Sequence, residues 1–275
     1  MASATAPGPT TATGAPPEPR SAASAAQQVQ LRVWRSPRAG GQEAHFDTFA
    51  VDVDPARDYV LDCIERAWAA HDRTLVFRHA CHHGSCGTCA VRVDGRERLP
   101  CITRLAEVWD GSAPLTIEPL RNFPVIADLA VDVSGLQARM AAVRLPYVRT
   151  VEALVRAVAT GDLADLDGDV GAAERFEDCI ECGACISACP VAAGDADYLG
   201  PAILAAADRV AEEPRLDDPD RALDLVSGEH GVWQCRSVWA CTAVCPSNVD
   251  PAGRIMNARR RIIERDWRRL TGGRG

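Results

Sequence analysis

Hydrophobic and polar residues alternate along the first part of the chain as they do in half-buried strands. The alternation runs from Val29 to Trp34 and again from His45 to Asp54. A period of two residues sends successive side chains to opposite faces of a sheet, so we predict two strands here. Between Cys89–Val93 and Arg98–Ile102 lies the pair Asp94-Gly95, which predicts a hairpin with a tight turn.

Helical spacing of apolar residues appears first at Tyr59, Cys63 and Trp68, which predicts a helix packed on the sheet. Two short strands complete this half, at Thr74–Phe77 and Leu115–Glu118. After Pro119 the pattern becomes Ala-rich and helical. The predicted helices are Leu136–Val143, Val151–Ala159, Ile203–Val210 and Gly253–Leu270.

The change of pattern predicts two domains, in agreement with roughly 150 residues per domain in a chain of 275. We predict an α+β protein with a sheet-rich domain over 28–125 and a helical domain over 126–275. Residues 1–27 are rich in Ala, Pro, Thr, Gly and Ser, which is typical of a disordered tail. The alternative is a transit peptide, although such peptides are normally Arg-rich.

Charge and cysteine content narrow the range of possible functions. All 30 basic residues are Arg, and 38 acidic residues leave a net charge of −8, which argues against a generally basic nucleic-acid binder. No run of about 18 apolar residues occurs, so any membrane association is expected through a partner. The 12 Cys are too sparse for a disulfide scaffold. Without an export signal they point to metal binding or catalysis in a reducing cytosol.

The first cysteine group has the spacing C-x4-C-x2-C-x11-C. The first three positions match the plant-type ferredoxin pattern for a [2Fe–2S] cluster. Gly84 and Gly87 lack Cβ atoms where backbone N–H groups approach the sulfurs. A zinc site is the alternative, for which this spacing is poor. The four proposed ligands are Cys81, Cys86, Cys89 and Cys101.

The second group reads C-x2-C-x2-C-x3-C-P, a bacterial ferredoxin run whose fourth Cys ligates a different cluster. A partial repeat downstream has Val238 where a Cys is expected. The crossover rule assigns Cys179, Cys182, Cys185 and Cys245 to a [4Fe–4S] cluster. The three thiols that remain favour a [3Fe–4S] cluster, with an ordinary [4Fe–4S] cluster damaged by air as the alternative. These three are Cys189, Cys235 and Cys241.

Two further features flank these groups. Cys63 lies on the apolar face of the predicted helix and is interpreted as a core thiol. Histidines 79, 82 and 83 crowd the first cysteine loop. They have the chemistry to ligate as in Rieske centres, but with four Cys nearby we interpret them as packing or supporting groups of the loop.

This order of motifs, with the linker Pro119–Leu129, resembles the iron–sulfur subunit of the succinate dehydrogenase/fumarate reductase (complex II) family over Val29 to Trp267. The resemblance implies a plant-type ferredoxin (β-grasp) domain followed by an all-α bacterial-ferredoxin-like domain. It also implies electron transfer from FAD in a partner subunit, through [2Fe–2S], [4Fe–4S] and [3Fe–4S] clusters, to a quinone. The chain has no dinucleotide fingerprint and no assembled acid–base site, so we expect it to move electrons only.

The resemblance places the protein at the cytoplasmic side of the cell membrane, on anchor subunits with or without heme b. Ubiquinone-using members carry a Trp and a His where this chain has Gly194 and Arg236. Menaquinone, or a differently built pocket, is therefore expected. Arg236, Val238 and Trp239 are the candidates for the quinone vicinity. For Trp239 the alternative is buried packing, and for Arg236 a surface ion pair.

Other functions remain open at this level. The same chain would serve a fumarate reductase, an enzyme with a thiol- or heterodisulfide-linked partner, or a free-standing ferredoxin-like carrier. The stretch from Arg254 to Gly275 has eight Arg against Glu264 and Asp266. This excess of positive charge suits either an anionic lipid surface or contacts with protein and solvent.

Overall fold

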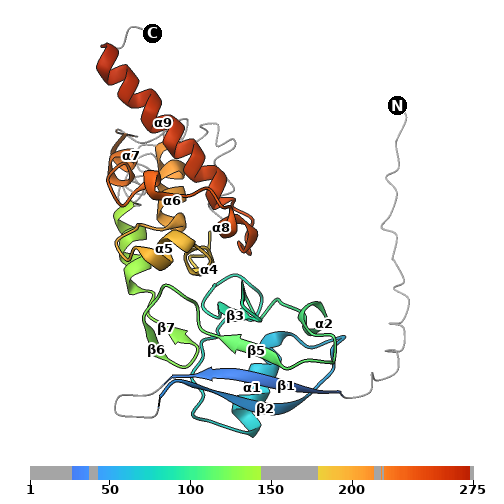
Figure 1. The fold of residues 1–275 in the computed structure, drawn as a ribbon. Coiled ribbons are helices and arrows are strands. Elements are labelled where there is room, and N and C mark those ends of the chain that lie inside the picture. The colour runs from blue at the N-terminus through green and yellow to red at the C-terminus, as the bar shows by residue number, and fades with distance from the viewer. Residues whose placement is uncertain (1–26, 37–42, 144–178, 214–217, 219, 273–275) are drawn as a thin grey trace, which may run out of the picture.

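The structure is a computed structural model that describes residues 27–36, 43–143, 179–213, 218 and 220–272. Figure 1 shows a sheet-containing unit at one end and a stack of helices at the other, with the last helix projecting away from the sheet. The α+β class predicted from the sequence is confirmed. Residues 1–26 and the predicted helix Val151–Ala159 lie outside the described residues.

A five-stranded sheet forms the first unit, with strand order β2-β1-β5-β3-β4. β1 pairs antiparallel with β2 and parallel with β5. Val29, Leu31 and Val33 of β1 are fully buried, so the alternation in the sequence is confirmed as a strand with one buried face. The strands are β1 (Gln27–Arg35), β2 (His45–Val53), β3 (Val91–Val93), β4 (Arg96–Arg98) and β5 (Leu115–Glu118).

The helix α1 (Val60–Ala70) packs on this sheet, as its apolar spacing predicts. Its first turn is closed by Asp62, whose carboxylate accepts a hydrogen bond of 2.7 Å from the backbone N–H of Tyr59. Cys63 and Ile64 are buried on the inner face. A short helix, α2 (Leu105–Val108), follows β4.

Two sequence-based boundaries need correction. β1 begins at Gln27, which was assigned to the tail, because Gln27 pairs with Val53 of β2. β4 ends at Arg98, before most of the predicted strand Arg98–Ile102. Pro100 has no N–H to donate to a strand ladder, and its carbonyl instead accepts from the N–H of Leu61 at 3.1 Å.

Thr74–Phe77 is not a strand. Val76 in this segment bonds the linker instead: its N–H donates to the Asp128 carboxylate at 2.8 Å, and its carbonyl accepts from the N–H of Leu129 at 3.1 Å. The linker itself forms a two-stranded hairpin of β6 (Val125–Ala127) and β7 (Ala130–Val131). The partner of Thr74–Phe77 is therefore a turn of the linker, which offers too few bonds to form a ladder.

Helices make up the second unit. Residues 134–143 are helical. Leu204 and Ala205 of α6 are fully buried at its centre, and α9 lies against α6. The predicted helices at 136–143, 203–210 and 253–270 are confirmed. The remaining elements are α4 (Ala184–Ser187), α5 (Pro190–Gly194), α6 (Pro201–Ala211), α7 (Asp220–Val226), η3 (Val232–Gln234), α8 (Ala240–Ala243) and α9 (Pro251–Thr271).

The arginines of α9 are largely neutralised within the chain. Arg254 and Arg261 flank the fully buried carboxylate of Asp208 on α6, at 3.3 and 3.2 Å. Arg265 and Arg269 pair with Asp224 of α7. These ion pairs favour protein contacts over lipid as the role of the positive charge. None of the described helices combines the length and the apolarity needed to cross a membrane.

Arg35 forms ion pairs with three carboxylates from different segments of the first unit. The guanidinium of Arg35 lies 3.0 Å from Asp47, 2.5 Å from Asp72 and 3.2 Å from Asp128. Its hydrogen bond lowers the pKa of Asp72 to about 2. The Asp128 side chain is 4% exposed and also accepts from the backbone N–H of Ser36 and Val76. Arg35 therefore neutralises the buried carboxylate that holds the linker on the sheet.

We expect Arg35→Ala to destabilise the first unit strongly, because it leaves Asp128 charged, buried and without its cation. Breaking a buried pair in this way costs about 3–5 kcal/mol. Thermal unfolding of the full chain measures the change as a fall in Tm of at least about 6 °C. Arg57→Ala is the matched control, since the Arg57 side chain is 61% exposed and lies 3.8 Å from Asp54. An equal Tm for both variants would contradict the assignment.

Candidate metal centres

The first cysteine group lies on the loop between α1 and β3 and in the turn after β4. The Sγ atoms of Cys89 and Cys101 are 3.4 Å apart and buried. This separation excludes a disulfide, which needs about 2.05 Å, and suits two thiolates on one metal ion. Cys81 and Cys86 lie nearer the surface, where the N–H of Cys86 points at the Cys81 sulfur at 3.4 Å.

Glycines shape this loop in a way that the sequence only partly predicts. Gly84 and Gly87 both have positive φ angles, of 80° and 67°. A Cβ on Gly87 would lie 2.8 Å from Cβ of Cys182 and 2.9 Å from the carbonyl oxygen of Ile180. Gly87 is therefore a point of close contact between the first cysteine loop and the second group, and no side chain fits there.

The four cysteines that the crossover rule assigns to one cluster, called the second group from here on, line a single pocket. They come from the segment before α4, from α4 and from the turn after α8. Burial raises the pKa of Cys182 to about 11 and raises that of Cys185 well above its usual value. Thiolates here need a metal ion to replace their protons, so metal binding releases protons. The four are Cys179, Cys182, Cys185 and Cys245, the set that the crossover rule predicts.

The three cysteines that the crossover rule leaves for another cluster, called the third group from here on, line another pocket. Burial, together with the negative charges of Cys235 and Cys189, raises the pKa of Cys241 to about 11. The N–H of Ser237 lies 3.4 Å from the Cys235 sulfur. Val238 also lines this pocket. The thiols are Cys189, Cys235 and Cys241, as the sequence predicts.

The three groups follow one another through the molecule. Cys86 and Gly87 of the first group line one pocket together with Cys179 and Cys182 of the second. The second and third groups share α4, which carries Cys185 and ends just before Cys189. The charge of Cys241 contributes to the raised pKa of Cys185. With metal bound, this arrangement would let an electron pass from the first cysteine group to the second and then to the third.

The residues predicted near a quinone lie together at the outer edge of the third pocket. Val238 is 58% exposed and Trp239 is 47% exposed, and Arg236 is also exposed. The alternative of a buried Trp239 is therefore wrong for this chain. Buried Tyr198 lines the inner side of the same pocket.

A network that the sequence analysis missed joins the two units beside these pockets. The side-chain amide of Asn122 donates to the carbonyls of Ile186, Ser187 and Cys189, at 2.8, 3.2 and 3.2 Å. Ser187 Oγ donates to buried Glu97 of β4 at 2.8 Å and accepts from the N–H of Arg121 at 2.9 Å. The signal for this network in the sequence is the polar pair Arg121-Asn122 inside a mostly apolar linker.

Cys63 belongs to none of these groups. It is fully buried in the first core, where desolvation raises the pKa of its thiol to about 12. Its Sγ lies 3.6 Å from the carbonyl oxygen of Tyr59. The interpretation as a core thiol is confirmed.

Comparison with known proteins agrees with this geometry. Residues 30–138 match a 2Fe-2S iron-sulfur cluster binding domain, and residues 175–249 match a 4Fe-4S dicluster domain. The fumarate reductase iron-sulfur subunit of Mycobacterium tuberculosis is 38% identical over 207 residues, which cover 75% of this chain and 82% of that protein. The succinate dehydrogenase iron-sulfur subunit of Paracoccus denitrificans is 30% identical over 240 residues, which cover 86% of this chain and 88% of that protein.

A solved structure shows the same fold. A chain of the Mycobacterium smegmatis Sdh1 complex in the apo form superposes with a TM-score of 0.71 at 28% identity. The match covers 88% of this chain and 98% of that one.

We expect Gly87→Ala to separate the first two cysteine groups. The left-handed backbone costs an alanine about 1–2 kcal/mol, and the contact with Cys182 adds about 1–3 kcal/mol of overpacking. Gly95→Ala is the matched control, because φ is also positive there, at 80°, but the nearest atom, of Arg92, is 3.6 Å from the new Cβ. Thermal unfolding of the two variants should show the larger loss of Tm for Gly87→Ala; equal losses would show that the contact is unimportant.

Proposed function

Because the chain belongs to the family of succinate dehydrogenase and fumarate reductase iron–sulfur subunits, we propose that it relays electrons from a flavin subunit to a quinone. The chain is an iron–sulfur electron-transfer subunit of an oxidoreductase complex. The observation that carries the proposed route is the succession of three cysteine groups through both units.

We assign a ligand set to each centre. Cys81, Cys86, Cys89 and Cys101 would hold [2Fe–2S], and the four thiols of the second pocket would hold [4Fe–4S]. The third pocket offers thiols on three sides and the apolar Val238 on the fourth, which fits [3Fe–4S]. When bound, such clusters accept and release single electrons, at potentials set by cluster type, hydrogen bonds to sulfur and exposure.

The residues of the chain hold the proposed clusters in position and shield them from water. Cys89 and Cys101 of the first set and Cys189 and Cys241 of the third are buried, which keeps water from much of these two centres. Backbone N–H groups of Cys86 and Ser237 point at sulfur atoms, where they stabilise negative charge. We further propose that the units divide as 27–125 and 126–275, with the first built as a β-grasp ferredoxin domain.

The exposed ends of the route indicate where partners dock. Cys86 is exposed, so the first loop is open to an electron donor, which we propose to be FAD in a partner subunit. At the other end, Arg236, Val238 and Trp239 are exposed beside the third pocket. We propose that quinone and the membrane-anchor subunits meet this edge, at the cytoplasmic side of the cell membrane.

Menaquinone is the proposed quinone. Gly194 and Arg236 occupy the positions where the ubiquinone-using pattern has Trp and His, so neither of those donors is present. The direction is proposed as succinate oxidation. Fumarate reduction is the second candidate, favoured by the 38% identity to the fumarate reductase subunit of M. tuberculosis.

Purification of the native complex tests this function. We expect a flavin subunit and membrane anchors in stoichiometric amounts, and a succinate:menaquinone activity above the succinate:ubiquinone activity. Succinate oxidation and fumarate reduction are compared in the same preparation to settle the direction. Recovery of the chain alone, with no flavoprotein, would instead identify a free-standing carrier.

Val238→Cys tests the third ligand set. We expect the added thiolate to complete a fourth corner, so that the EPR signal of oxidised [3Fe–4S] disappears and a four-iron centre replaces it. Val238→Ser is the control, because it is similarly small and polar but offers no thiolate. An unchanged [3Fe–4S] signal in Val238→Cys would place the open corner elsewhere.

A further inference from the structure

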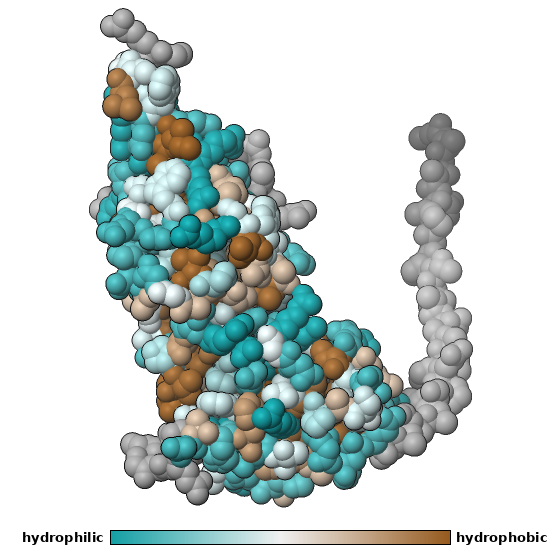
Figure 2. Space-filling view, in the orientation of Figure 1, coloured by the Kyte–Doolittle hydropathy of each residue, from teal (hydrophilic) through white to brown (hydrophobic). Residues whose placement is uncertain are grey.

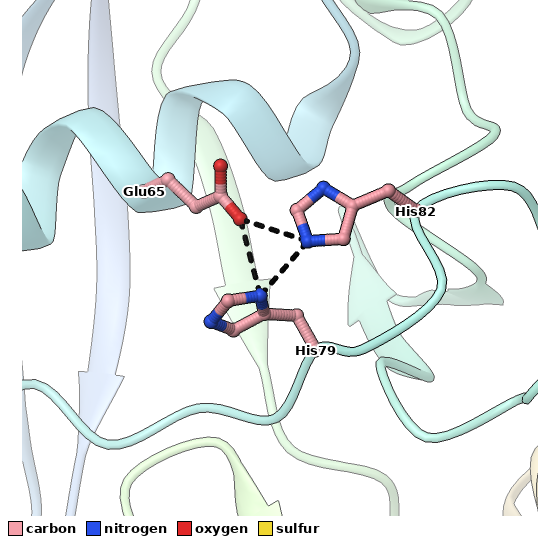
Figure 3. Close-up of side chains that lie close together, drawn as sticks. All are labelled: Glu65, His79 and His82. Carbon is pink, nitrogen blue, oxygen red and sulfur yellow. Dashed lines mark hydrogen bonds and ion pairs between the residues drawn. The ribbon is translucent and has the colours of Figure 1, made fainter.

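Three side chains converge beside the first cysteine loop without belonging to any cysteine group. Glu65 comes from α1, whereas His79 and His82 come from the loop that carries Cys81. Figure 3 shows the two rings and the carboxylate pointing toward a common centre. His79 Nδ1 and His82 Nε2 are 2.9 Å apart, and Glu65 Oε1 lies 3.3 and 3.5 Å from them.

The surroundings hold these side chains in place. The His79 ring stacks on Phe77, with ring centroids 5.2 Å apart and an interplanar angle of 20°. His82 has a positive φ of 61°, which turns its ring toward His79. Glu65 Oε1 is covered by protein yet has no hydrogen-bond partner. The oxygen that faces the two nitrogens is thus shielded from water and unsatisfied, which costs free energy unless something binds there.

Hydrogen bonding among the three groups cannot satisfy all three atoms at once. If one imidazole N–H donates to the other ring nitrogen, no facing proton remains for Glu65 Oε1; if both nitrogens donate to Glu65 Oε1, two N–H groups face each other across 2.9 Å. A cation at the centre satisfies all three atoms at once. The donor set of two imidazoles and a carboxylate is the one that Zn²⁺ and related divalent ions prefer.

The dimensions fit such an ion. A triangle with sides of 2.9, 3.3 and 3.5 Å has its corners about 1.9 Å from its centre. Zinc bonds nitrogen and carboxylate oxygen at about 2.0–2.2 Å. An ion placed slightly above the plane of the three atoms therefore reaches normal bond lengths without moving them. Its remaining position faces outward, where water completes the coordination.

We propose that Glu65, His79 and His82 form a binding site for a divalent transition-metal ion, with Zn²⁺ as the preferred occupant. The ion would tie α1 to the loop of the first cysteine group. His82 follows Cys81 directly, so the ion would lie close to the first centre while sharing none of its ligands.

Equilibrium dialysis of the cluster-loaded full chain against ZnCl₂ tests the site, after treatment with EDTA and with zinc and iron counted by elemental analysis. We expect one zinc bound per chain at this site. Glu65→Gln should weaken that binding at least tenfold, because it removes the anionic ligand while leaving the cysteine loop untouched. His79→Ala should do the same, with the iron content confirming that the clusters are retained.

His230→Ala is the matched control. His230 lies with Asp195 and Asp197 in another exposed group that has metal-ligand chemistry, on the helical unit. Its loss should leave the zinc site unchanged. Equal zinc affinity in wild type and Glu65→Gln, or loss of the ion only in His230→Ala, would overturn the proposal.

A second measurement locates the ion. Paramagnetic Co²⁺ in this site should speed the spin relaxation of the reduced [2Fe–2S] centre, and this effect should vanish in Glu65→Gln. Unchanged relaxation in wild type with cobalt bound would place the ion elsewhere. The zinc count does not depend on the proposed electron route, so the two proposals can fail separately.

Discussion

The need to bring thiols from distant segments to common points governs this structure. Cys245 lines a pocket with three cysteines more than fifty residues earlier, whereas Cys189, their close neighbour in sequence, faces Cys235 and Cys241. Because each of these two pockets takes cysteines from both segments, α4 and α8 must lie together. Burial raises the pKa of Cys185 and Cys241, so the pockets disfavour free thiolates. Folding of the helical unit and metal binding are therefore expected to support each other.

The relation between the two units depends on hydrogen bonds at the ends of α4. A helix of four residues has no following turn to bond the carbonyls at its end, and the Asn122 side chain from the linker donates to three carbonyls at that end and just beyond it. Glu97 and Ser187 connect the same turn to the sheet. With Gly87 in contact with Cys182, these bonds set the spacing between the first two cysteine groups.

Charge and exposure are distributed unevenly over the helical unit. On the inner face of α9, Arg254 and Arg265 pair with acidic residues of α6 and α7, whereas Arg260 and Arg268 are exposed. Apolar residues remain exposed along the far half of α9, where Figure 2 shows hydrophobic surface near the end of the helix. These are Ile263, Trp267 and Leu270.

The sequence by itself determined the α+β class, β1, β2, α1 and the long helices, because periodicity reports which face of an element is buried. Cysteine spacing also predicted which thiols share a pocket, since the ferredoxin crossover follows a regular rule. Only the tertiary structure decided that Thr74–Phe77 bonds the linker rather than a sheet, that Asn122 caps α4, and that Glu65 meets His79 and His82. Each of these contacts joins segments that lie far apart in the chain. Periodicity describes only neighbouring residues, so no local sequence pattern predicts the contacts.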